Sequence, residues 1–106
     1  MTGAALFEIL SSDASERTYR LRVTGELDAA TGPRLLTSLR RAGDVASRVC
    51  LDLGGVTFID CSGLSVLLTA LQEAQRDGWE LELDQPISRP VRRMLQMAGV
   101  NRRLWS

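Results

Sequence analysis

The part of the chain that most constrains its fold is residues 48–77, where a strand-like segment passes directly into a helix-like one. The segment "RVCLDLGGVTFI" (48–59) is mostly β-branched and apolar, which predicts a central strand covered on both faces. After it, apolar residues recur at i, i+3, i+4 and i+7, which predicts an amphipathic helix that continues to about Asp77 and ends at Gly78. These helical positions are Leu64, Leu67, Leu68 and Leu71.

The segments on either side of this unit also alternate between two periodicities. "ALFEIL" (5–10) and "TYRLRVTGEL" (18–27) carry apolar residues at every second position and are separated by polar residues, so they predict a β-hairpin with one solvated face. "WELEL" (79–83) predicts a further strand. In "SRPVRRMLQMAGV" (88–100), Val91, Leu95 and Ala98 lie at helical spacing before Gly99.

A first helix is predicted between the hairpin and the central strand. Asp28 and Thr31 are candidate caps, Pro33 lies near the helix start, and Gly43 is the expected stop. The predicted order is therefore β-β-α-β-α-β-α within a single domain spanning residues 1–106. Because a helix between strands returns the chain across a sheet face, we expect an α/β fold with a mixed sheet of four to five strands that opens with an antiparallel hairpin.

Composition excludes several classes of function. The 13 basic and 13 acidic residues cancel, so no overall field favours binding to nucleic acid or to an anionic membrane. No N-terminal targeting signal and no apolar run near the length of a membrane span is evident, so we expect cytoplasmic residence. The two cysteines, Cys50 and Cys61, lack the spacing of a disulfide framework or a metal site, and no cofactor motif is present.

The segment "DCSG" (60–63) concentrates reactive side chains where the central strand meets the helix, an edge at which open α/β sheets place functional sites. The exposed N–H groups of a helix start favour the thiolate of Cys61, which is one route to catalysis. The chain contains no histidine, however, so Cys-His and Ser-His arrangements are excluded within it, and Ser62 is not in a nucleophile elbow. We therefore expect a protein that is not an enzyme.

Two other readings of this segment remain. In the first, Ser62 is a phosphorylation site: phosphate at a helix N-terminus gains N–H donors, and its charge beside Asp60, and beside Asp28 if the two loops adjoin, would repel a docked partner. In the second, the segment is structural, with Asp60 capping the helix, Ser62 supplementing the cap and Gly63 permitting close packing.

Three stretches favour the functional reading by resemblance. "GELDAATGPRLLTSL" (25–39), "VCLDLGGVTFIDCSGLSVLLTALQEAQRDGWELEL" (49–83) and "VRRMLQMAGV" (91–100), in this order and spacing, resemble a STAS domain of the anti-sigma factor antagonist family. The resemblance covers nearly the whole chain. It implies a bacterial protein that binds an anti-sigma factor, commonly an ATP-dependent serine kinase, and so releases a sigma factor for transcription. The kinase phosphorylates the antagonist at the helix start, and a phosphatase reverses the modification.

The resemblance also implies a partner-binding surface, and it locates a departure from the family pattern. Cys61 occupies the position of the phosphorylated serine, and Ser62 follows it. Three hypotheses result: a switch that uses Ser62, a constitutive binding module in a signalling assembly, and a redox-sensitive replacement of the switch by Cys61. The residues expected at the partner surface are Asp28, Asp60, Cys61, Ser62, Gly63 and Leu64.

Overall fold

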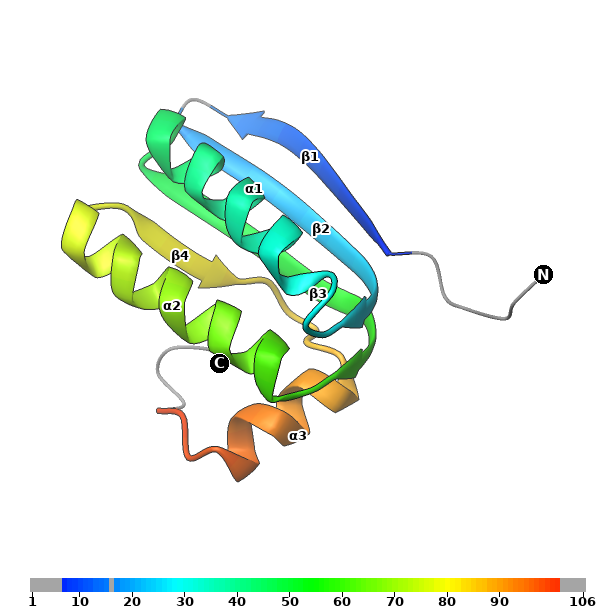
Figure 1. Cartoon of the computed structure of the whole chain (residues 1–106). Helices are drawn as coiled ribbons and strands as arrows, with labels where there is room; N and C mark the ends of the chain where they lie inside the picture. Colours follow the sequence, from blue (N-terminus) through cyan, green and yellow to red (C-terminus); the bar gives the residue numbers. More distant parts are fainter. Residues whose placement is uncertain (1–6, 16, 102–106) are drawn as a thin grey trace.

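The computed structural model describes residues 7–15 and 17–101, with residues 12–15 described by backbone only. Its elements follow the predicted order (Figure 1). They are β1 (Glu8–Ser15), β2 (Thr18–Leu27), α1 (Gly32–Val45), β3 (Arg48–Ile59), α2 (Cys61–Asp77), β4 (Glu80–Leu83) and α3 (Arg89–Met97).

The strands form one mixed four-stranded sheet in the order β1-β2-β3-β4. β1 pairs antiparallel with β2, whereas β2 with β3 and β3 with β4 are parallel. α1 and α2 cross back between the parallel strands, and they run side by side over one face of the sheet (Figure 1). The predicted α/β class, opening hairpin and mixed sheet are confirmed.

The core lies between these two helices and the sheet. Buried residues alternate along β2, and Leu21 and Val23 lie on the same face of the sheet as Leu51 and Leu53 of β3. Helix residues at i, i+3 and i+4 spacing cover them, and these are Leu35, Leu39, Ala42, Leu67, Ala70 and Ala74.

The opposite face of β3 is covered less than predicted: Cys50 is buried there, but its neighbours on that face, Arg48 and Asp52, are exposed and partly exposed. This face carries ion pairs instead of a second apolar layer. The Arg22 guanidinium lies 3.2 Å from the Asp52 carboxylate, and Arg20 pairs with Asp84. β3 therefore follows the one-sided pattern of a sheet with a solvated face.

Two predicted boundaries also differ from the structure. β1 continues through the polar residues 11–15, because their backbone pairs with β2 in a register such as Ser11 opposite Leu21. α1 does not stop at Gly43 but continues to Val45. A Cβ at Gly43 would lie 2.5 Å from Cε2 of Trp79, so this glycine makes room for the indole ring instead of ending the helix.

α3 packs against β3 and buries Val91 and Leu95, two of the three residues predicted at helical spacing, whereas the third, Ala98, is the exposed C-cap residue. The end of α2 at Asp77 and its left-handed C-cap Gly78 (φ 83°) match the prediction.

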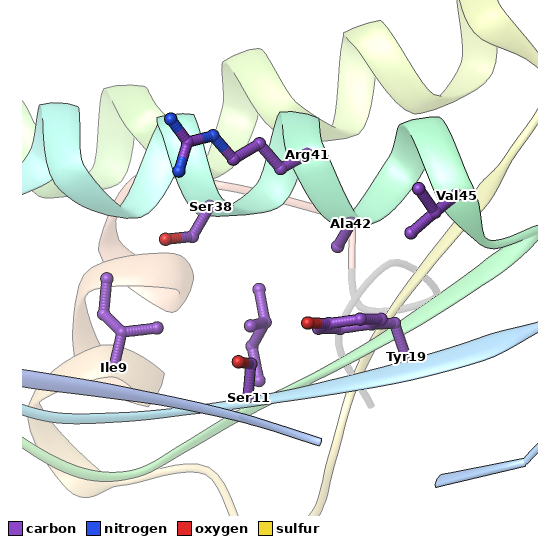
Figure 2. Close-up of a pocket in the computed structure, with 8 residues that line it drawn as sticks. Ile9, Ser11, Tyr19, Ser38, Arg41, Ala42 and Val45 are labelled. Carbon is purple, nitrogen blue, oxygen red and sulfur yellow. The ribbon is translucent and has the colours of Figure 1, made fainter. Parts of the chain in front are cut away.

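A hollow of about 340 Å³ lies between α1 and the hairpin (Figure 2), which we call the hairpin hollow. Ile9 and Tyr19 line its strand side, and Ala42 and Val45 line its helix side. Figure 2 shows that the side chain of Arg41 extends along α1 and not toward the strands.

Candidate functional site

The junction between β3 and α2 is built by Asp60. Its backbone is extended (φ −116°, ψ −171°), and its side chain accepts a hydrogen bond from the Gly63 N–H at 3.1 Å. The Asp60 carbonyl oxygen accepts from the Leu64 N–H at 3.0 Å, which is the first helical bond of α2. Asp60 is therefore the N-cap residue that the structural reading predicted.

Gly63 ties this junction to the end of β2. A Cβ at Gly63 would lie 2.5 Å from the Leu27 carbonyl oxygen and 2.9 Å from Cγ1 of Ile59. The Asp60 N–H also donates to the Leu27 carbonyl oxygen at 3.3 Å. The start of α2 can therefore approach the end of β2 this closely only without a side chain at residue 63.

Asp28 organises the turn that follows β2. Its Oδ1 accepts from the backbone N–H groups of Ala30 (3.0 Å) and Thr31 (3.1 Å). The N–H of Thr31, foremost, and that of Ala30 hold the pKa of the Asp28 carboxyl below its ordinary value, against the opposing effect of desolvation. Asp28 thus stabilises the turn before α1 as an ionised carboxylate.

Thr31 is the N-cap residue of α1, but its side chain does not make the capping bond that the sequence predicted. Its hydroxyl instead donates to the Glu26 carbonyl oxygen at 2.7 Å and accepts from the Asp28 N–H at 3.0 Å. The two predicted caps therefore act together on the β2–α1 turn.

The two loops adjoin, as the switch hypothesis requires. Asp28 and Ser62 line the same hollow, of about 360 Å³, between the first half of α1 and the first half of α2. We call it the junction hollow. A Cβ at Gly32 would lie 2.9 Å from Cγ2 of Val66, so the two helices approach closely along its floor.

The six predicted site residues divide by exposure. Cys61 and Ser62 are exposed, and Asp28 and Asp60 are partly exposed. Gly63 and Leu64 are buried, with Leu64 only 9% exposed and part of the core. Gly63 and Leu64 therefore support the exposed residues of the junction and offer a partner little contact area.

The rest of the wall that α2 contributes to the junction hollow was not predicted from the sequence. This wall is formed by Ser62, Ser65, Val66 and Thr69. Their i, i+3, i+4, i+7 spacing could have predicted this wall, since residues at that spacing share one face of a helix, and here that face is made mostly of small and polar residues.

The chemistry available at this surface is that of an exposed thiol, a hydroxyl and two carboxylates. Cys50, by contrast, is 5% exposed, and burial raises the pKa of its thiol.

In residues 7–15 and 17–101 no three histidine, cysteine, aspartate or glutamate side chains gather into a metal-binding group. Over the same residues, none of the helices combines the length and the apolar character that crossing a bilayer would need.

Comparison with known proteins identifies the same domain type. The family model described as "Mlab, STAS domain" matches residues 10–105. Among solved structures, the phosphorylated form of the Bacillus cell fate determinant SpoIIAA is 19% identical, with a TM-score of 0.73 over 93% of this chain and 89% of that one. An anti-sigma factor antagonist from Mycobacterium paratuberculosis is 21% identical, with a TM-score of 0.75 over 95% of this chain and 86% of that one.

The same fold also occurs inside a much larger protein. The murine anion transporter Slc26a9 matches at 18% identity with a TM-score of 0.70, over 84% of this chain but only 15% of that one. At such identities, the likeness to these three structures shows a shared fold.

Proposed function

Because this chain belongs to the STAS domain family, we propose that it is an anti-sigma factor antagonist that binds its partner through the junction of β3 and α2. The observation that carries the proposal is the shared junction hollow, where the exposed start of α2 and the Asp28 turn form one surface. The likeness to the Bacillus anti-sigma factor antagonist SpoIIAA and to the Mycobacterium anti-sigma factor antagonist supports it. The partner would be an anti-sigma factor of the serine-kinase type, and its capture would release a sigma factor.

The surface suits regulation by phosphate for a physical reason. A phosphate on Ser62 would add nearly two negative charges at the N-terminus of α2, where free N–H groups stabilise it. The carboxylates of Asp60 and Asp28 lie at the same junction, so the partner would face concentrated negative charge. Phosphorylation would therefore expel the partner while the fold is retained, and a phosphatase would restore binding.

Cys61 favours a second candidate function at this surface. A thiol does not accept phosphate from a serine kinase, and Cys61 holds the position that precedes Ser62 at the helix start. If Ser62 is not phosphorylated either, the protein is a constitutive STAS binding module. The exposed Cys61 thiol would then leave oxidation or alkylation as the remaining chemical control.

The test compares wild type, Ser62→Ala and Cys61→Ser, each incubated with a serine-kinase anti-sigma factor from the same genome and ATP. Binding is measured by pull-down and phosphate by intact-protein mass spectrometry. If regulation acts through Ser62, the wild type gains one phosphate and dissociates from the anti-sigma factor. Ser62→Ala gains no phosphate and stays bound. Labelling that persists in Ser62→Ala would reject this assignment.

The constitutive module predicts a different pattern. Wild type stays unlabelled and bound at every ATP concentration, whereas Cys61→Ser gains phosphate and dissociates. A redox switch predicts that oxidant releases the wild type and not Cys61→Ser. If no variant binds any such anti-sigma factor, the proposed antagonist function is wrong.

A further inference from the structure

A second surface lies on the other side of β3, between the end of that strand and α3. It is a groove of about 430 Å³, which we call the α3 groove. Phe58 lines it from the strand, and Pro90, Met94 and Met97 line it from the helix, with Arg89 and Arg93 beside them. None of these residues lines the junction hollow.

The apolar part of the α3 groove is unusually exposed. Phe58 is 47% exposed and Met97 is 79% exposed, and both are large side chains that the fold leaves uncovered. α3 buries Val91 and Leu95 on its inner side, so Met94 and Met97 form a separate stripe at the groove. Methionine side chains adapt to irregular apolar surfaces, which suits them to contact a partner.

The charge that α3 and its flanking residues bring to the groove has one sign, whereas on the strand side the exposed Glu26 of β2 lies opposite Phe58. Residues 85–101 contain three arginines and no aspartate or glutamate. Arg92 donates to the Ile87 carbonyl oxygen at 3.2 Å, whereas Arg89 and Arg93 are exposed and form no ion pair with any described residue. They lie at i and i+4, so both guanidinium groups can reach one bound segment.

From this juxtaposition of two exposed apolar anchors and two unpaired arginines, we propose that the α3 groove docks an acidic amphipathic segment of a partner protein. Leucine-like side chains of that segment would cover Phe58 and Met97, and its carboxylates would pair with Arg89 and Arg93. This docking site is separate from the proposed phosphate-regulated surface and does not depend on it.

Charge argues against the other occupants. Residues 102–106 carry two more arginines and residues 1–6 carry no acid, so neither of these segments has an acidic side chain to pair with Arg89 and Arg93. In a symmetric contact with a second copy, Arg89 and Arg93 would face the same two arginines of that copy, and the like charges would repel. The hairpin hollow is a poorer candidate, because its single arginine, Arg41, extends along α1 (Figure 2).

The test uses a fluorescein-labelled helical peptide of about 16 residues, with leucines at i, i+3, i+4 and i+7 and glutamates between them, and a matched peptide with lysines. Binding is measured by anisotropy and located by amide chemical-shift changes. The wild type is expected to bind the glutamate peptide about tenfold more tightly, and the Arg89→Glu/Arg93→Glu variant to reverse this preference. Met97→Ser is expected to weaken binding about threefold to tenfold through lost apolar contact.

Matched controls come from the hairpin hollow, where Arg41→Glu and Val45→Ser change an exposed arginine and an exposed apolar residue. They should leave peptide binding unchanged, as should Cys61→Ser. Circular dichroism melts verify that each variant is folded. The proposal is overturned by equal affinity for both peptides, by shift changes outside the α3 groove, or by controls that weaken binding as much as Met97→Ser.

Two further measurements distinguish the rejected occupants. A concentration-dependent dimer, seen by light scattering and lost in Met97→Ser, would assign the groove to a second copy. Binding to phosphatidylglycerol vesicles without binding to the glutamate peptide would assign it to an anionic membrane. Either result contradicts docking of a protein segment.

Discussion

Gly63 is the residue on which the geometry of the candidate site depends most directly. Because a Cβ there would lie 2.5 Å from the Leu27 carbonyl oxygen, Gly63→Ala must push α2 away from the end of β2. We expect the variant to lose about 1–3 kcal/mol of unfolding free energy, the usual cost of overpacking. Urea denaturation followed by circular dichroism measures this loss.

Ser62→Ala is the matched control, because it alters the adjacent, exposed residue of the same helical turn. Its unfolding free energy should lie within about 0.5 kcal/mol of the wild type. If the two variants lose the same stability, steric contact at Gly63 is not what holds the junction together.

Asp60 supports the same junction by capping, and this role can be separated from its charge. Asp60→Ala removes the acceptor for the Gly63 N–H and should cost about 1 kcal/mol, whereas Asp60→Asn retains an oxygen acceptor and should cost less. Thermal unfolding of both variants at pH 7 tests this. A cost for asparagine equal to that for alanine would show that charge, and not the capping bond, matters.

At the scale of elements, α1 and the start of β4 are joined through Gly43 and Trp79. Gly43→Ala places a Cβ about 2.5 Å from the indole ring and should destabilise the protein by about 1–3 kcal/mol. In a Trp79→Leu background the obstruction is gone, and the same change should stabilise α1 by about 0.5–1 kcal/mol, since alanine is the better helix former. A double-mutant cycle by urea denaturation measures the coupling. Additive effects would contradict the contact.

This contact also explains which features the sequence could predict. Apolar periodicity is local, and it was sufficient to predict the order of the seven elements and the span of β3. Gly43 looked like a helix stop because the residue that requires it, Trp79, is distant in the sequence. The polar residues of β1 looked like a loop because the strand is held by backbone pairing with β2, which leaves little trace in side-chain pattern.

The candidate site was predictable in part for a topological reason. The carboxyl ends of the parallel strands β2 and β3 meet at one sheet edge, which brings Asp28 near Asp60 and Ser62. The burial of Leu64 follows from its place in the apolar helical series with Leu67, and it conflicts with the expectation, drawn from resemblance, that Leu64 lies at the partner surface.

At the scale of the whole molecule, stability should depend on pH through a few carboxylates. Among the residues whose side chains the structure describes, three carboxyls have lowered pKa values: that of Glu73 is lowered by the hydrogen-bonded Arg40 side chain, that of Asp77 by Arg76, and that of Asp28 by the Thr31 N–H. A lowered pKa means that the unfolded chain binds more protons than the folded one, so stability rises with pH. This contribution is present above the unfolded values of about 3.9 for Asp and 4.3 for Glu, and it is lost as pH falls through the folded values.

The melting temperature should therefore be nearly constant between about pH 6 and 8, where a chain without histidine has few groups to titrate, and should fall below about pH 4.

Glu73 supplies the sharpest test, because its carboxylate joins α2 to α1 through two hydrogen bonds from Arg40, of 2.8 and 2.6 Å. Glu73→Gln should lower the melting temperature at pH 7 and have a smaller effect at pH 3, because the wild-type carboxylate loses its charge as the pH falls. Glu8→Gln, at an exposed carboxylate that pairs with no described residue, is the control and should change neither value. If Glu73→Gln lowers the melting temperature equally at both pH values, the ionised pair with Arg40 is not the source of the acid sensitivity.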